Sequence, residues 1–145
     1  MPAKLGELVT ATPVILIVED DPETRQLYRS IFERDGFHIE QAHNGLQALE
    51  KATAAVPDLI ITDIAVPGID GIELCRRLRA DERTREIPIL AITGYGDRAY
   101  PDRVIVAGAN QVLTKPCGPE LLVAEARRLL AASAPRALRP VTPKL

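Results

Sequence analysis

Apolar runs alternate with amphipathic stretches along this chain, and the two patterns predict strands and helices in turn. Four short runs are almost purely apolar, which is typical of strands buried on both faces of a parallel sheet. They cover residues 14–18, 59–61, 89–92 and 112–113. Residues 38–42 alternate polar and apolar side chains instead, which favours a strand at an edge of the sheet. The pattern therefore predicts five strands.

Helix signals fill the gaps between these strands. Asp21 and Pro22 are suited to be an N-cap and a first-turn proline. The helix that follows is expected to bury one face, which carries Leu27 and Tyr28. In chain order, the predicted helices cover residues 22–35, 45–56, 71–79, 101–107 and from about 118 onward.

Five strand–helix repeats with right-handed crossovers predict an α/β fold, in which a doubly wound parallel sheet carries helices on both faces. An edge strand at residues 38–42 fits the strand order 2-1-3-4-5, which places the other four strands side by side. One domain is expected over residues 13–131, between a flexible leader at residues 1–12 and a flexible tail at residues 132–145 that contains proline and arginine. The tail is either a true terminus or the start of a linker.

Composition narrows the class of protein. A length of 145 residues with 46% hydrophobic content suits one compact domain. The formal net charge of −2, and the lack of a basic stripe interleaved with aromatic residues, argue against direct nucleic-acid binding. The densest basic stretch, residues 76–85, mixes arginines with acids and is expected to be a solvated helix end. Neither a membrane span nor a signal peptide is evident, so we expect a cytoplasmic protein without membrane contact.

Each of the four apolar runs leads into residues suited to handling a phosphoryl group. The first run leads into Glu19 and Asp20, and the second into Asp63. The third run ends at Thr93, and the last reaches Lys115. Because the carboxyl ends of neighbouring parallel strands share one edge of a sheet at a spacing of about 5 Å, the five side chains are expected to share one pocket.

The three acids of this set predict a cation site. Glu19, Asp20 and Asp63 would bring up to three negative charges together, which is unfavourable unless a cation neutralises them. Ligands that are all oxygen atoms select a hard ion, so we expect Mg²⁺, with Mn²⁺ as the alternative. A plain helix-capping run of acids is the competing interpretation. Asp21 alone would explain the helix start, however, which leaves the other acids without a role.

The remaining residues suggest the chemistry. A carboxylate such as Asp63 can attack phosphorus and form an acyl phosphate when a metal ion and a second cation offset the charge that develops. Lys115 would supply that cation, and Thr93 a hydroxyl donor to a phosphoryl oxygen. A lone lysine at a strand end is usually a solvated charge, so the hypothesis rests on the joint placement of these residues.

These residues resemble the receiver domain of two-component response regulators, the CheY-like family. The resemblance covers about residues 13–131 and implies a flavodoxin-like (βα)5 fold. Four motifs carry it: Ile-Leu-Ile-Val-Glu-Asp-Asp-Pro at 15–22, Asp-Ile-Ala-Val-Pro-Gly-Ile-Asp-Gly at 63–71, Ile-Thr-Gly at 92–94 and Lys-Pro at 115–116.

The resemblance also implies site roles and partners. Asp63 would be the phosphoacceptor, with a sensor histidine kinase or a histidine phosphotransfer protein as the donor. Asp20, Asp63 and the main-chain carbonyl of Ala65 would bind Mg²⁺, and Glu19 would act through a water. The phosphoryl group would be held by Thr93 and Lys115.

Two details of the resemblance concern the last strand. The resemblance implies a cis bond between Lys115 and Pro116, and only X-Pro bonds adopt cis at low cost. Val112 stands where many receivers have an aromatic residue that turns inward on activation. Since valine cannot make this large rotamer change, the usual output coupling through the fourth helix and fifth strand is in question. Val112 as an ordinary buried strand residue is the competing interpretation.

Two positions that vary within the family border the phosphorylation site. Ala65 lies two residues after the aspartate, and Tyr95 two residues after the threonine. We hypothesise that the small Ala65 leaves a path for water while Tyr95 partly screens it, which would set the lifetime of the acyl phosphate. His38 and His43 lie on or beside the edge strand, so both are expected to be surface residues and not phosphodonors.

The favoured hypothesis is a switch that a sensor histidine kinase phosphorylates and that a partner protein, not identified by the sequence, reads. No output domain is expected after the last helix. A stand-alone regulator, a phosphorelay intermediate or phosphate sink, and a receiver cut from a longer protein therefore all stay open. A phospho-independent docking scaffold and a metal-dependent phosphatase or nucleotide-binding enzyme are the other classes. We expect self-modification without turnover of a free substrate, and a monomer or a weak homodimer through the fourth helix, fifth strand and fifth helix.

Overall fold

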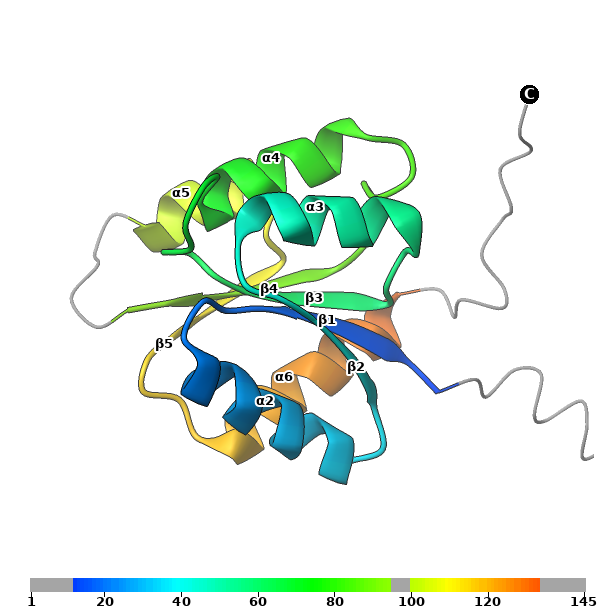
Figure 1. Cartoon of the computed structure of the whole chain (residues 1–145), viewed down its shortest axis with the longest axis vertical. Helices are drawn as coiled ribbons and strands as arrows, with labels where there is room; N and C mark the ends of the chain where they lie inside the picture. The colour runs from blue at the N-terminus through cyan, green and yellow to red at the C-terminus, as the bar shows by residue number, and fades with distance from the viewer. Residues whose placement is uncertain (1–11, 95–99, 134–145) are drawn as a thin grey trace, which may run out of the picture.

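The computed structural model describes residues 12–94 and 100–133, which form one parallel sheet with helices on both faces (Figure 1). The strands are β1 (Val14–Val18), β2 (His38–Ala42), β3 (Leu59–Asp63), β4 (Ile89–Thr93) and β5 (Gln111–Thr114). The helices are α2 (Pro22–Arg34), α3 (Gly45–Ala54), α4 (Gly71–Ala80), α5 (Tyr100–Ala107) and α6 (Pro119–Ala132). Each element lies within a few residues of its predicted position, so the predicted alternation is confirmed.

The strand order β2-β1-β3-β4-β5, with every pair parallel, confirms the predicted flavodoxin-like fold. β3 and β4 are buried throughout, as their apolar runs predict. β2 alternates exposed and buried residues, as expected of an edge strand. β5 forms the opposite edge, as the predicted order implies, but it is not buried on both faces: three of its residues are partly buried and Thr114 is exposed.

Two apolar cores lie on the two faces of the sheet (Figure 1). α2 and α6 cover one face, while α3, α4 and α5 cover the other. Alternate residues of the central strands serve the two cores, because successive side chains of a strand point to opposite faces. Ile15 and Ile17 pack with Phe32 beneath α2, whereas Leu16 and Val18 belong to the core on the opposite face.

Three helices begin at side-chain caps that follow the strand ends. Asp21, Asn44 and Asp70 each accept a hydrogen bond from the backbone amide three residues further on. The start of α4 is also packed closely on the loop after β3. A Cβ atom on Gly71 would lie 2.7 Å from the Cα of Ile64, so only glycine fits there. These contacts fix the loops at the carboxyl ends of the strands.

The predicted inward face of α2 is partly wrong. Leu27 is 57% exposed, while Tyr28 and Phe32 are buried. The two buried aromatic residues are one turn apart and pack against the sheet. The neighbouring side chain of Leu27 therefore points away from the sheet.

The basic stretch at 76–85 is also not simply solvated. Arg79 is half-buried, and its guanidinium donates to the main-chain oxygens of Arg85, Ile87 and Gly108 and to the side-chain oxygen of Asn110. Burial lowers the pKa of Arg79. This side chain therefore joins the end of α4 to the start of β4 and the end of α5.

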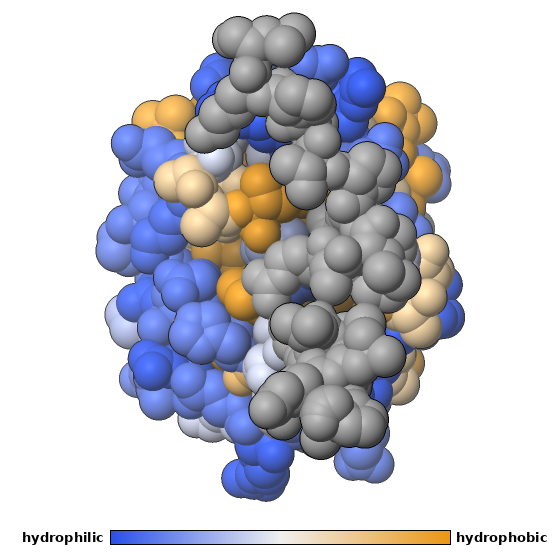
Figure 2. Space-filling view, turned by 90° about the vertical axis from the view of Figure 1, so that its right-hand side faces the viewer, coloured by the Kyte–Doolittle hydropathy of each residue, from blue (hydrophilic) through white to orange (hydrophobic). Residues whose placement is uncertain are grey.

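Figure 2 views the end of the molecule opposite the carboxyl ends of the strands. Where the described residues are visible on this face they are mostly hydrophilic, and apolar side chains gather near its centre. A hollow lies here between the starts of β1 and β2 and the end of α3, lined in part by Val14, His38 and Val56. His38 and His43 are both exposed, as predicted. The five residues predicted to handle a phosphoryl group lie at the opposite end of the sheet, where the strands end: Glu19, Asp20, Asp63, Thr93 and Lys115.

Several predictions concern residues at the limits of the described ranges. The leader at residues 1–12 and the tail at residues 132–145 lie almost entirely outside them. Within the described part of the chain, no helix is both long and apolar enough to cross a membrane. Cys75 is buried and Cys117 is partly buried, and neither forms a disulfide bond.

Candidate functional site

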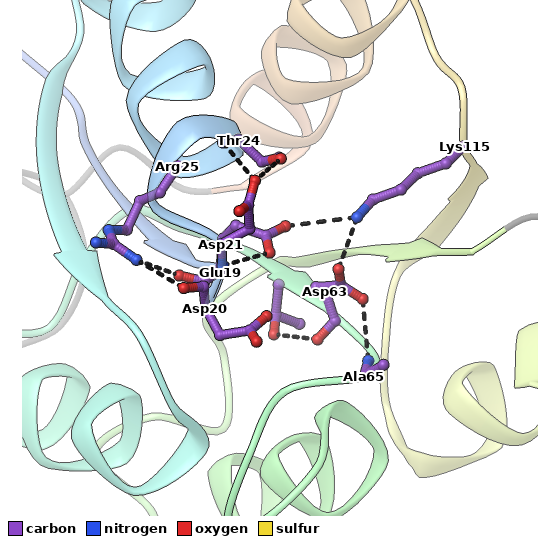
Figure 3. A network of polar contacts seen from close by, with 9 residues as sticks. Glu19, Asp20, Asp21, Thr24, Arg25, Asp63, Ala65 and Lys115 are labelled. Atoms are coloured by element: carbon purple, nitrogen blue, oxygen red, sulfur yellow. Dashed lines mark hydrogen bonds and ion pairs between the residues drawn. The ribbon is translucent and has the colours of Figure 1, made fainter.

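The five side chains predicted to share a pocket lie at one edge of the sheet, where the strands end. Glu19 and Asp20 directly follow β1, Asp63 and Thr93 are the last residues of β3 and β4, and Lys115 follows β5. In Figure 3, Lys115 reaches across from its strand toward Glu19 and Asp63. The strand order thus joins residues almost a hundred positions apart in the sequence.

Lys115 forms the centre of the polar network. Its Nζ lies 2.7 Å from Oδ2 of Asp63 and 3.5 Å from Oε1 of Glu19. Burial by itself would lower the pKa of Lys115, but the hydrogen bond to Asp63 and the negative charges of both acids outweigh it and raise the pKa. The ammonium group therefore stays charged at neutral pH and neutralises part of the acidic cluster.

Glu19 is the most deeply buried acid of the cluster, with 2% of its surface exposed. Its Oε2 accepts a hydrogen bond of 3.1 Å from the backbone amide of Asp21. Burial, aided by the charge of Asp63, raises the pKa of Glu19 to about 6, although the Asp21 amide and Lys115 act in the opposite direction. Glu19 is thus a carboxylate at neutral pH, held at a cost in desolvation.

Both carboxylate oxygens of Asp63 have a partner. Oδ2 pairs with Lys115, and Oδ1 accepts a hydrogen bond of 2.9 Å from the backbone amide of Ala65. The hydroxyl of Thr62 donates to the main-chain oxygen of Asp63 over 2.8 Å. Asp63 as a whole residue is 9% exposed, so its carboxylate is fixed in orientation but still reachable from the surface.

Thr93 carries a buried hydroxyl group without a partner among the described residues. The residue is only 1% exposed. A buried hydroxyl that makes no hydrogen bond is costly, and such groups are rare in folded proteins. The hydroxyl at the end of β4, the strand beside that of Asp63, therefore has an unused capacity to donate a hydrogen bond.

The donor set fits a hydrated hard cation better than a closed metal cage. Among residues 12–94 and 100–133, no three acidic, histidine or cysteine side chains converge as a ready-made metal centre. Instead, the Lys115 ammonium lies between Glu19 and Asp63. Asp20 is exposed, and Figure 3 shows its carboxylate free of the dashed contacts that hold its neighbours. Mg²⁺ commonly uses one or two carboxylates and keeps several waters, which this arrangement allows.

The residues predicted to modulate the site have different outcomes. Ala65 is exposed beside Asp63, in agreement with a small side chain at an open position. Val112 is partly buried and packs against the core on the side of α5. Tyr95 lies outside the described residues, so its screening role stays a prediction. The cis bond between Lys115 and Pro116 is confirmed.

Two residues that hold the site were not identified from the sequence. The hydroxyl of Thr62 anchors the backbone of Asp63, and Arg25 on α2 donates to the main-chain carbonyl of Glu19. Thr62 looks like part of an apolar strand. The sequence did not indicate the role of Arg25, because an arginine on an amphipathic helix usually faces solvent. The only available signal was its position about one helical turn after the run of acids.

Comparisons with known proteins agree with this geometry. The family profile of the response regulator receiver domain matches residues 15–127. The DNA-binding dual master transcriptional regulator RpaA of Synechocystis is 39% identical over 118 residues, which are 81% of this chain and 49% of RpaA. The polar-differentiation response regulator DivK of Brucella ovis is 33% identical over 105 residues, 72% of this chain and 85% of DivK. The chain spans about half the length of RpaA and of similar curated relatives.

The likeness extends to solved structures. The receiver domain of a sensor histidine kinase from Pseudomonas aeruginosa superposes with a TM-score of 0.79 at 29% identity, covering 84% of this chain and 100% of that chain. That structure holds a magnesium ion coordinated in its active-site cleft.

Proposed function

Because the chain belongs to the response regulator receiver domain family, we propose that Asp63 accepts a phosphoryl group from a phosphohistidine in a reaction that requires Mg²⁺. The donor would be a sensor histidine kinase or a histidine phosphotransfer protein. The modified chain would then signal to a partner protein through a change in conformation.

One observation carries the proposal: an oriented carboxylate, a charged amine and an unpaired hydroxyl meet at one sheet edge. Asp63 is held by Lys115 at 2.7 Å, and the hydroxyl of Thr93 on the neighbouring strand has no partner in the described part of the chain. A phosphoryl oxygen attached to Asp63 would meet both a cation and a donor. These are the groups that stabilise the charge of a transferred phosphoryl group.

The chemical step is a transfer between two protein side chains. A carboxylate oxygen of Asp63 attacks phosphorus, the bond from phosphorus to the donor imidazole nitrogen breaks, and the imidazole leaves with the electron pair. Lys115 would leave the carboxylate and pair with a phosphoryl oxygen, while the Thr93 hydroxyl donates to another. Attack of water on the acyl phosphate later releases inorganic phosphate and restores the carboxylate. The cycle is self-modification, not turnover of a free substrate.

The cation would be held by Asp20, Asp63 and the carbonyl of Ala65, with Glu19 acting through a water. When bound, Mg²⁺ neutralises charge on the acids and on the incoming phosphoryl oxygens. Glu19, Asp20 and Ala65 lie with Asp63 at the edge of the sheet where the strands end. Mn²⁺ in the same place stays a prediction, as does a cytoplasmic location.

A relay intermediate or phosphate sink is the second candidate, and Val112 is the observation that favours it. This valine on β5 is too small to copy the large rotamer change of an aromatic residue. A weak homodimer through α5, β5 and α6 would favour the switch instead, and α5 exposes Ile105 and Val106 on its outer side. The two candidates differ in how far the effect of phosphorylation extends.

The proposal is tested by incubating the protein with Mg²⁺ and a small acyl phosphate and measuring the intact mass. One added phosphoryl group is expected, and Asp63→Asn should abolish the addition. Asp102→Asn, which changes an exposed aspartate on α5, is the matched control and should label like the parent. Labelling that persists in Asp63→Asn, or that is independent of Mg²⁺, contradicts the proposal.

A stable beryllofluoride mimic then separates the two candidates. Amide resonances are compared with and without the mimic in Mg²⁺. Shifts that extend from the site to α5 and β5 support a switch that reaches this surface. Shifts confined to the residues around Asp63 support a relay or a sink.

A further inference from the structure

Arg25 is a charged residue beside the acidic cluster to which the proposed function gives no role. It lies in the first turns of α2, and its side chain points back toward the loop that carries Glu19 and Asp20 (Figure 3). We propose that Arg25 is a positioning residue, which holds this loop so that the acids face the cation. The inference rests on the proposed function and adds a residue that sets how tightly the site binds Mg²⁺.

The contacts of Arg25 are directed at the backbone of the acids. Its Nη1 lies 2.7 Å from the main-chain oxygen of Glu19 and 3.4 Å from that of Asp20. The last ladder contact of β1 on this side is the hydrogen bond from the Glu19 amide to the oxygen of Ala42. Beyond that point the chain leaves the sheet, and its carbonyl groups need other donors. Arg25 supplies them at the place where the two acids begin to project.

The direction of these bonds keeps the carboxylates available. Arg25 bonds main-chain oxygens, so its charge approaches the cluster without forming an ion pair that would compete with a metal ion. The side chain of Glu19 remains free to contact Lys115 and the Asp21 amide. In Figure 3 the carboxylate of Asp20 points away from Arg25. A cation that binds Asp20 therefore meets a loop already shaped for it.

The guanidinium group suits this task better than an amine would. It is planar, always charged, and presents several N–H donors in a fixed geometry, whereas a lysine ammonium is a flexible point charge. The loop from Glu19 to Asp21 is also held at its other end, where the side chain of Asp21 accepts from Thr24. Loss of Arg25 would thus free one end of a short loop that is fixed at the other.

The decisive measurement is Mg²⁺ affinity by calorimetry, with no phosphodonor present. Three variants are compared: Arg25→Met, Arg25→Lys and the matched control Arg29→Met. Arg29 lies one turn further along the same helix, where it forms an exposed ion pair with Glu33. Since groups that orient metal ligands typically contribute a factor of 10 to 100 in affinity, Arg25→Met should weaken Mg²⁺ binding by about tenfold or more. Arg25→Lys should weaken it by a smaller factor, and Arg29→Met should not change it.

A second readout follows the loop itself in the metal-free protein. The Asp21 amide, which donates to Glu19, should exchange its hydrogen faster in Arg25→Met than in the parent and in Arg29→Met. If Arg25→Met does not fold, Arg25→Lys carries the test alone. Parental affinity and parental exchange in Arg25→Lys would then overturn the inference.

The outcomes distinguish this inference from the proposed function. If the parent binds Mg²⁺ and Arg25→Met binds it equally well while folded, the role of Arg25 is refuted and the proposed function stands. If the parent itself does not bind Mg²⁺, the proposed function fails, and the role of Arg25 fails with it.

Discussion

The backbone amide of Lys115 donates a hydrogen bond of 2.8 Å to the main-chain oxygen of Thr93. The two residues expected to hold the phosphoryl group are thus joined at the ends of β4 and β5, independently of their side chains. One of them has its side chain paired with Asp63, while the other has a buried hydroxyl without a partner in the described ranges. This asymmetry makes the two side chains separable by mutation.

Thr93→Val should stabilise the protein while it slows labelling of Asp63. Removal of a buried, unpaired hydroxyl by an isosteric change should raise the free energy of unfolding by about 1 kcal/mol. Loss of a donor to the phosphoryl group should lower the labelling rate about 100-fold. Urea unfolding and intact-mass kinetics measure the two effects.

The control for this prediction is Thr62→Val, at the neighbouring strand end. The hydroxyl of Thr62 is equally buried but donates to the main-chain oxygen of Asp63. Its removal should therefore destabilise the protein by about 1 kcal/mol. Equal destabilisation by the two variants would show that the hydroxyl of Thr93 is satisfied in solution.

Glu19→Gln should remove a pH dependence of stability. The pKa of Glu19 is about 6 in the folded protein against an ordinary value of 4.5, because burial disfavours the charge. Between these values the folded state binds more protons than the unfolded state, so stability is lost as the pH rises from about 4.5 to about 6. The loss is on the order of 2 kcal/mol by pH 7 for a shift of this size.

Urea unfolding of the metal-free protein at pH 4.5 and pH 7.5 tests this prediction. Relative to the parent, Glu19→Gln should gain stability at the higher pH and little at the lower pH. Glu82→Gln, which changes an exposed residue, should follow the parent at both values. A Glu19→Gln variant that loses as much stability as the parent over this range would contradict burial of Glu19 as the cause.

Gly71→Ala should destabilise the protein through a direct clash with the backbone. The added Cβ would lie 2.7 Å from the Cα of Ile64 and 2.9 Å from the main-chain oxygen of Asp63. Neither atom can move without displacing the loop after β3, so a cost of about 2 to 3 kcal/mol is expected. Gly118→Ala is the control, since nothing lies within 4 Å of its added Cβ. If Gly71→Ala and the control unfold at the same temperature, the loop after β3 can move to accept the added methyl group, and the predicted clash is contradicted.

Arg79→Met should destabilise the protein although its charge is far from the site. The guanidinium donates to three main-chain oxygens and to the side chain of Asn110. Its loss should cost about 2 to 3 kcal/mol, because several of these acceptors are partly buried. Arg76→Met removes only an exposed pair with Glu73 and should cost about 0.5 kcal/mol or less. Similar denaturation midpoints for the two variants would show that the hydrogen bonds of Arg79 between α4, β4 and α5 do not stabilise the fold.

The sequence predicted the fold and the site for the same physical reason. Apolar runs mark buried strands, and in a parallel sheet the residues that follow such runs meet at one edge. The sequence alone therefore predicts that Asp63, Thr93 and Lys115 lie together. The strand at 38–42 could be assigned to the edge because its alternation implies one exposed face.

Long side chains account for most of what the sequence did not reveal. Arg25 and Arg79 lie on helices whose polar positions usually face water, yet both reach back to main-chain oxygens. Such contacts depend on where a distant carbonyl group lies, and the pattern of residue types does not contain that information. Leu27 is exposed although helical spacing predicts it inward, because the spacing alone does not show how wide a stripe of the helix the sheet covers.

The position of Lys115 between Glu19 and Asp63 has a consequence for folding of the protein. Its ammonium already compensates the mutual repulsion of the acids, so the chain can reach its native state before any ion arrives. A magnesium ion in the proposed site would compete with this built-in counter-charge, so its apparent affinity would be a difference between two attractions. Occupancy should consequently follow the cellular supply of the ion, while the integrity of the fold does not.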